Sequence, residues 1–181
     1  MSRDIRIFST PQRVVVGTVG LPGERIFYLQ VDQDQSRVWI RVEKQQVATL
    51  AEQMQRIVAT LMDQGIDVPP MSTRDDRPLD TPIEEDFIAS AIGLGWDEDN
   101  ERVVVELHAL GESEPADFGD DDPDAADTVR IELTLPQTAS FAERTQAVVA
   151  AGRPTCPLCQ LPLEPTGHIC PRANGYRRHS A

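Results

Sequence analysis

The sequence predicts an α+β fold in which a mainly antiparallel sheet carries its helices on one face. Two observations predict this class. Segments rich in β-branched and aromatic residues precede a segment with helical periodicity, and this βββα order occurs twice along the 181 residues. Strands grouped ahead of a helix are typical of α+β domains rather than of alternating α/β folds.

The first unit is expected to cover residues 1–65. Its helix should run from Lys44 to Gln64 and end at Gly65, because glycine commonly closes helices. The three expected strands are Arg13–Val19, Arg25–Val31 and Arg37–Val42. The apolar stripe of the helix recurs at three- and four-residue steps: Val47, Leu50, Ala51, Met54, Ile57, Val58 and Leu61.

The second unit is expected to cover residues 87–151 and to end with a helix over 137–151. Its expected strands are Phe87–Leu94, Arg102–Leu110 and Thr128–Leu133. Residues 66–86 contain Pro69, Pro70, Pro78 and Pro82 and are interpreted as an extended connector. Residues 111–127 contain eight carboxylates and are expected to form a solvated loop, with metal capture or mimicry of a phosphate backbone as alternatives.

The two units also share individual residues. A shift of 91 residues pairs identical side chains at eight positions: Ile40/Ile131, Gln46/Gln137, Ala48/Ala139, Ala51/Ala142, Glu52/Glu143, Gln55/Gln146, Val58/Val149 and Ala59/Ala150. In the first strands, Val19-Gly20-Leu21 matches Ile92-Gly93-Leu94. Two amphipathic helices can coincide at apolar positions by chance, but coincident Gln and Glu are harder to explain. We therefore interpret the chain as a duplicated βββα module whose units bury faces that neither could bury alone.

The composition indicates a folded cytoplasmic protein without a membrane segment. Hydrophobic residues make up 40% of the chain, and no apolar run approaches the roughly 18 to 20 residues that a membrane span needs. The N-terminus is too charged for a secretory signal. The three cysteines are an odd number, so they cannot all pair as disulfides within one chain.

A zinc site is predicted in the tail formed by residues 152–181. Cys156 and Cys159 form a Cys-x-x-Cys pair, and His168 and Cys170 follow with one residue between them. In an extended segment, this second spacing points both side chains the same way. Three thiolates and one imidazole fill a tetrahedral zinc site, so we expect a small zinc knuckle with structural Zn²⁺.

The cysteines and histidines of the tail allow other interpretations. A thioredoxin-like redox pair should open a helix after a strand, which Pro154 disfavours. The thiols could also be incidental, and His179 could replace His168 as the fourth ligand. His108 lies in a predicted strand and is expected to be a core or surface residue rather than a ligand.

The charge distribution makes the tail either a docking face or simply a solvated terminus. The net charge is −13, which argues against a general nucleic-acid-binding body. Residues from 151 onward carry four arginines and one glutamate, or +3, so the rest carries −16. The partner-binding candidates are Arg172, Asn174, Tyr176, Arg177 and Arg178. Tyr176 could stack on a base of single-stranded RNA, as in zinc knuckles, or it could pack onto the body while the arginines pair with its acidic surface.

Two segments carry a likeness to a known family. They are Gly-Glu-Arg-Ile-Phe-Tyr-Leu-Gln at 23–30 and the run around Cys156-Pro-Leu-Cys and Gly-His168-Ile-Cys-Pro-Arg-Ala-Asn-Gly-Tyr. Together they resemble domain-of-unknown-function family 3090, a bacterial family best known from actinobacteria. The resemblance implies a zinc-ribbon-like C-terminus and no particular activity. We therefore expect a zinc-binding scaffold for a protein or nucleic-acid partner rather than an enzyme; the alternative is a hydrolase or transferase with its site between the repeats.

Overall fold

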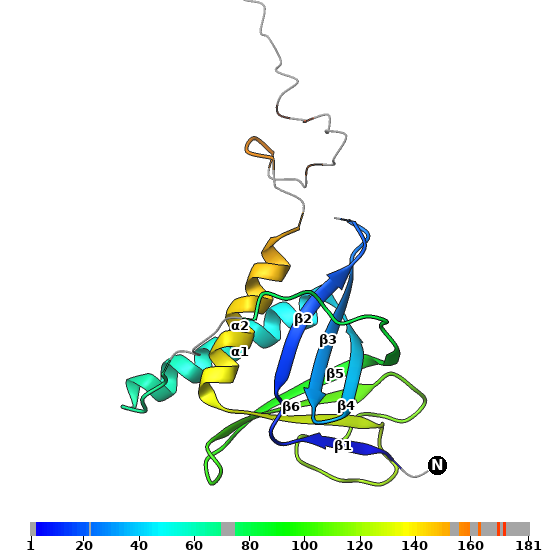
Figure 1. The fold of residues 1–181 in the computed structure, drawn as a ribbon, viewed down its shortest axis with the longest axis vertical. Coiled ribbons are helices and arrows are strands. Elements are labelled where there is room, and N and C mark those ends of the chain that lie inside the picture. Colours follow the sequence, from blue (N-terminus) through cyan, green and yellow to red (C-terminus); the bar gives the residue numbers. More distant parts are fainter. Residues whose placement is uncertain are drawn as a thin grey trace, which may run out of the picture.

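The computed structural model describes residues 3–21, 23–69, 75–152, 156–159, 163, 170 and 172. In these ranges a mixed seven-stranded sheet packs against two helices, which confirms the predicted α+β class (Figure 1). The strands are β1 (Ile5–Phe8), β2 (Arg13–Val19), β3 (Ile26–Gln33), β4 (Ser36–Val42), β5 (Glu85–Asp97), β6 (Arg102–Ala109) and β7 (Thr128–Leu133). The helices are α1 (Lys44–Asp63) and α2 (Leu135–Ala150).

The predicted elements lie close to those of the structure, with one strand missed. β2 and β7 have the predicted bounds, and α1 ends at Asp63, one residue before the predicted Gln64. Gly65 follows the helix with a left-handed φ of +90°. β5 is longer than predicted at both ends. Strand β1 was missed because it has four residues, two of which, Ile5 and Ile7, carry the only apolar signal before Phe8.

The sheet curls strongly. Its strand order is β1-β7-β6-β5-β4-β3-β2, and neighbours are antiparallel except in the pairs β1–β7 and β4–β5. A flat sheet would place β1 and β2 about 29 Å apart, at six spacings of about 4.8 Å. Only residues 9–12 join these two strands, and the chain from Phe8 to Arg13 reaches at most about 18 Å. The two ends of the sheet must therefore approach each other.

The two parallel pairs occupy matching places in the two halves of the body. We call β1–β4 with α1 the first half and β5–β7 with α2 the second half. Ile40 in β4 lies opposite Phe87 in β5, and Ile131 in β7 lies opposite Phe8 in β1. Ile40 and Ile131 are 91 residues apart in the sequence. Each half thus begins with residues that pair with the last strand of the other half.

One glutamine on each helix links that helix to the other half. Gln46 Oε1 accepts the N–H of the residue that caps α1 (2.8 Å), and its Nε2 donates to the carbonyl of Ala89 in β5 (3.2 Å). Gln137 Oε1 likewise accepts the N–H of the residue that caps α2 (3.0 Å), and its Nε2 donates to the carbonyl of Pro11 (2.9 Å). These matched interactions support the duplication, which stays a prediction.

Both helices pack against each other and against the inner face of the sheet. Between them Gln146 Nε2 donates to Gln55 Oε1 (2.7 Å), and these glutamines are 91 residues apart. The buried stripe of α1 is the one predicted, except that Ile57 is only partly buried. Inward side chains from both halves form one continuous apolar core.

The pairing in the sheet corrects one part of the predicted repeat. Cross-strand partners lead from Ile40 through β3 to Val16, and from Ile131 through β6 to Leu94. If the two isoleucines correspond, Val16 corresponds to Leu94. The sequence match placed Leu21 opposite Leu94, which is wrong by five residues. The match depended on an apolar-Gly-apolar triplet, which is too short to fix the register of a strand.

The connector and the acidic loop fold onto the outer face of the sheet. Leu79 of the connector is buried over Gly17, where an added Cβ would lie 2.5 Å from its Cγ. Phe118 of the acidic loop covers Gly95, where an added Cβ would lie 2.4 Å from its Cε1. All eight carboxylates of the loop are exposed, as a solvated loop requires, but Phe118 anchors it to the sheet.

Replacing Gln46 or Gln137 by alanine should lower the free energy of unfolding by about 1–2 kcal/mol, because each variant loses a helix cap and a link between the halves. Urea denaturation measures the change. Gln45→Ala is the matched control, since Gln45 is exposed on α1 and bonds only to Thr49 within its own helix. Equal effects of the Gln45 and Gln46 variants would contradict the proposed role.

Candidate metal centre

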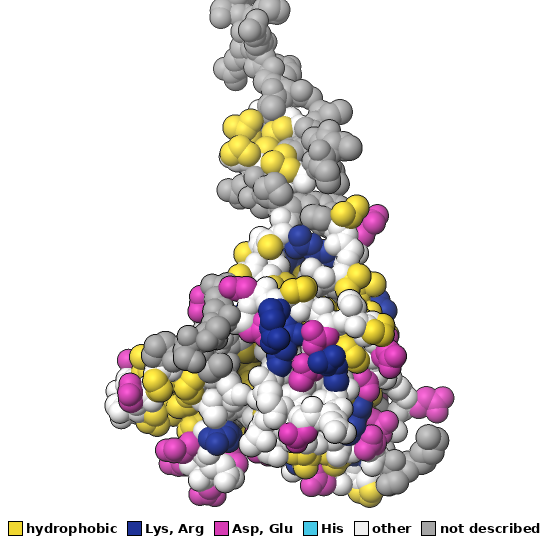
Figure 2. All heavy atoms as spheres, viewed as in Figure 1, with side chains coloured by type: hydrophobic (Ala, Val, Ile, Leu, Met, Phe, Trp, Pro, Cys, Tyr) yellow, Lys and Arg dark blue, Asp and Glu magenta, His cyan; other side chains and the backbone are white. Residues whose placement is uncertain are grey.

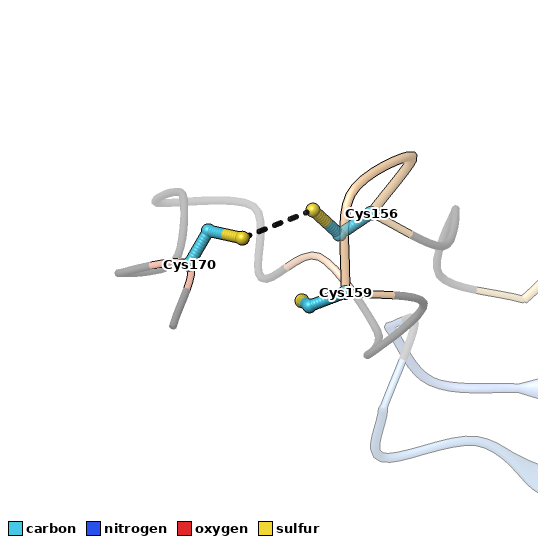
Figure 3. Close-up of side chains that lie close together, drawn as sticks. All are labelled: Cys156, Cys159 and Cys170. Atoms are coloured by element: carbon cyan, nitrogen blue, oxygen red, sulfur yellow. Dashed lines mark hydrogen bonds between the residues drawn. The ribbon is translucent and has the colours of Figure 1, made fainter. Parts of the chain in front are cut away.

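Three cysteine sulfur atoms gather in the C-terminal segment. The Sγ atoms of Cys156, Cys159 and Cys170 all lie within 4.8 Å of one another (Figure 3). The Sγ atoms of Cys156 and Cys170 are 3.7 Å apart. Cys156 and Cys159 lie at the two ends of one tight turn, whereas Cys170 comes from a later part of the chain. The structure therefore brings together the three thiols that the sequence predicted as ligands.

The spacing of these thiols fits a shared metal ion. A tetrahedral zinc ion with Zn–S bonds of about 2.3 Å places its sulfur ligands about 3.8 Å apart. A disulfide would instead bring two sulfurs to about 2.05 Å, and none of the three cysteines is in a disulfide. The 3.7 Å between Cys156 and Cys170 agrees with the first geometry. Thiolate donors at this distance suit zinc and other soft or borderline metals.

The turn also favours the form of Cys156 that binds a metal. Hydrogen bonds from the backbone N–H groups of Cys159 and then Leu158 lower the pKa of Cys156 to about 7. Backbone N–H groups pointing at a sulfur stabilise the thiolate, which is the metal-binding form of cysteine. A substantial fraction of this thiol is therefore ionised at neutral pH without a metal.

Arg172 braces the same turn. Its NH1 donates to the carbonyl oxygen of Leu158 at 3.1 Å. This hydrogen bond ties the residues after Cys170 to the residues between Cys156 and Cys159. The sequence suggested Arg172 only as a partner-binding residue, because nothing in a linear motif shows which carbonyl an arginine will reach.

The remaining predicted residues of the tail lie outside the described residues. They are the expected fourth ligand His168, its alternative His179, and the partner-binding candidates Asn174, Tyr176, Arg177 and Arg178. Their roles stay predictions.

His108, which was expected to be either a core or a surface residue, is a core residue. Its side chain is buried, and its Nδ1 lies 3.0 Å from the hydroxyl of Thr128. Burial lowers the pKa of His108, so the neutral ring is favoured. Among the described residues, the acidic loop forms no group of three carboxylates close enough to share a metal.

A pocket of about 480 Å³ lies between the two halves of the body, where the alternative hydrolase or transferase would need its site. The residues that line it come from β3, β4, the start of α1 and the end of α2. Its described lining includes Glu43 as the only acidic side chain and no Ser, Cys or His. The cationic residues Arg25, Arg41 and Lys44 also line it, and no motif in the sequence places these three together.

Neither of the two described helices is long and apolar enough to cross a membrane.

Comparisons with known proteins give one match. No curated protein and no solved structure matches the chain. The model of one family, described as "Protein of unknown function (DUF3090)", matches residues 6–170 and thereby includes both halves of the body and all three cysteines. The chain belongs to the DUF3090 family of proteins of unknown function.

Proposed function

We propose that this protein is a cytoplasmic zinc-binding scaffold, in which a structural Zn²⁺ orders the C-terminal segment. The supporting observation is the set of three thiols within 4.8 Å of one another. His168 would supply the fourth ligand, since it precedes Cys170 by two residues. Three thiolates and one imidazole leave no position for a substrate, so the metal would have a structural role.

A bound metal would stabilise an ordered tail, which its own apolar side chains are too few to do. Residues 152–181 contain few large apolar side chains, and a segment of this size cannot order itself by burial alone. Binding a structural zinc releases free energy that stabilises the ordered form. The hydrogen bond from Arg172 to the turn adds to the same arrangement.

The ordered tail would then present a basic surface to a partner. With three thiolates and one Zn²⁺, the +3 of the tail becomes about +2, on a body of −16. Tyr176 between arginines suits stacking on a base of single-stranded RNA. A protein partner with an acidic surface is the other candidate for this surface.

Catalysis between the halves is the second candidate function, since a pocket lies there. Its described lining offers several cations and one carboxylate, Glu43, but no Ser, Cys or His as a nucleophile. This lining favours binding over covalent catalysis, and we therefore place the scaffold first.

Purified protein should contain one zinc ion per chain by elemental analysis, and Cys159→Ser and Cys170→Ser should lose it. Limited proteolysis should then cut the variants after residue 152, because the segment loses its ordering metal. Leu158→Ser is the matched control: Leu158 is exposed in the same turn and contributes only backbone groups to the site. Reduced wild-type protein that binds no zinc would refute the site.

The fourth ligand can be identified by replacing each histidine of the tail. His168→Gln should weaken zinc binding by more than about a hundredfold, because loss of a ligand should exceed the effect of losing a second-sphere contact. His179→Gln should leave the affinity unchanged. Competition with a coloured chelator measures both, and the reverse order would assign His179 as the ligand.

Binding of a labelled single-stranded RNA should weaken as salt rises, and Arg177→Glu/Arg178→Glu should abolish it. If both arginines contact phosphates, the slope of log K against log [salt] for the wild type should be at least about 1.4 in magnitude. Arg56→Glu, an exposed change on α1, is the control for net charge. RNA binding that survives in the double variant would rule out the tail as the site, and absence of binding at low salt would leave the protein partner.

A further inference from the structure

The pocket between the two halves has a cationic wall and an apolar wall. Arg25 precedes β3, Arg41 belongs to β4, and Lys44 is the first residue of α1. The apolar lining consists of Ile26, Phe27, Val42 and Val149. The volume of about 480 Å³ lies within the range of roughly 300–1,000 Å³ that is typical of small-molecule sites.

The three cations of this pocket have no acidic partner in the described part of the chain. On the face shown in Figure 2, basic and acidic side chains lie intermingled, and most described arginines form ion pairs or hydrogen bonds. Among the described residues, the basic side chains with neither an ion pair nor a hydrogen bond are Arg25, Arg41, Lys44 and Arg56. Three of these four line one pocket of an acidic protein, and no described carboxylate forms an ion pair with them.

The second half of the body provides an internal comparison. Strand pairing places Phe27 opposite Val42 in the first half and Val103 opposite Leu133 in the second, so these pairs correspond. The residues that then correspond to Arg25, Arg41 and Lys44 are Glu101, Glu132 and Leu135. Two of the three cations are thus replaced by carboxylates. The positive wall is a property of one half and does not follow from the shared framework.

Lys44 lies at the rim of the pocket, close to the end of α2. Its Nζ would lie 3.6 Å from a Cβ at Gly152, next to the last carbonyls of that helix. The negative end of a helix dipole attracts an ammonium group. Gln46 completes the capping box at the start of α1. The proposed site therefore consists of cationic side chains and not of free N–H groups of the helix.

We infer that this pocket binds the phosphate group of a small organic phosphate, with Arg25, Arg41 and Lys44 as its contacts. Three cations less the carboxylate of Glu43 give the lining a charge of +2, which matches a phosphate monoester at neutral pH better than a single carboxylate. The guanidinium fork of arginine fits phosphate oxygens in pairs. The apolar wall would contact the organic part of the ligand. None of the three proposed contacts is a predicted zinc ligand or a partner-binding candidate of the tail.

Titration calorimetry on the full-length protein tests the inference, with phenyl phosphate, inorganic phosphate and benzoate as probes at constant ionic strength. Phenyl phosphate should bind most tightly, since it combines a dianion with an apolar ring, and inorganic phosphate should follow. Arg41→Ala and Lys44→Ala should each weaken phenyl phosphate binding at least about tenfold, as expected for a lost charge-assisted contact.

Arg56→Ala is the matched control. Arg56 is an unpaired, exposed arginine that lies about 18 Å along α1 from Lys44, at 1.5 Å per residue. It should leave the affinity unchanged, and urea denaturation should show that all three variants remain folded. A dissociation constant above about 10 mM for phenyl phosphate, or equal effects of the Arg41 and Arg56 variants, would overturn the inference. Benzoate binding as tightly as phenyl phosphate would overturn the assignment to phosphate.

Discussion

The rest of the structure depends on the exchange of strand pairing between the two halves. Residues at the start of β5 pair with β4, and β1 pairs with β7, so each half completes the sheet of the other. Gln46 and Gln137 repeat the exchange at the helices, because each bonds to the carbonyl of a residue in the opposite half. One apolar core results from this arrangement. The same pairing sets the strand order that the short link between β1 and β2 then curls.

The shared framework carries different surfaces. In the predicted repeat, Arg25 and Arg41 correspond to Glu101 and Glu132 of the second half. The outer coverings differ as well, since the connector closes over one half and the acidic loop over the other. Positions that bury apolar side chains are under the same packing constraint in both halves, whereas exposed positions are free to diverge. Function in such a body is therefore expected where the halves differ.

The sequence predicted what depends on local spacing and missed what depends on contacts between distant segments. The helical period of α1 and the left-handed Gly65 were readable from the chain, as was the Cys-x-x-Cys turn. Strand β1 was missed because its four residues have no stability apart from β7. The pocket could not be predicted because Arg25 approaches Arg41 and Lys44 only through the pairing of β3 with β4, and the end of α2 closes its other side. The bond from Arg172 to the metal-site turn likewise requires the tail to fold back.

The hydrogen bond between Gln55 and Gln146 joins equivalent positions of the two helices. In the predicted repeat, such a contact between matching positions requires a rotation axis that passes close to both glutamines. A chain with a single βββα unit would have an unpaired last strand and an uncovered helix face, and a second copy would satisfy both across the same axis. The predicted duplication would give the body the architecture of a homodimer joined into one chain, in which each half can change its surface independently of the other.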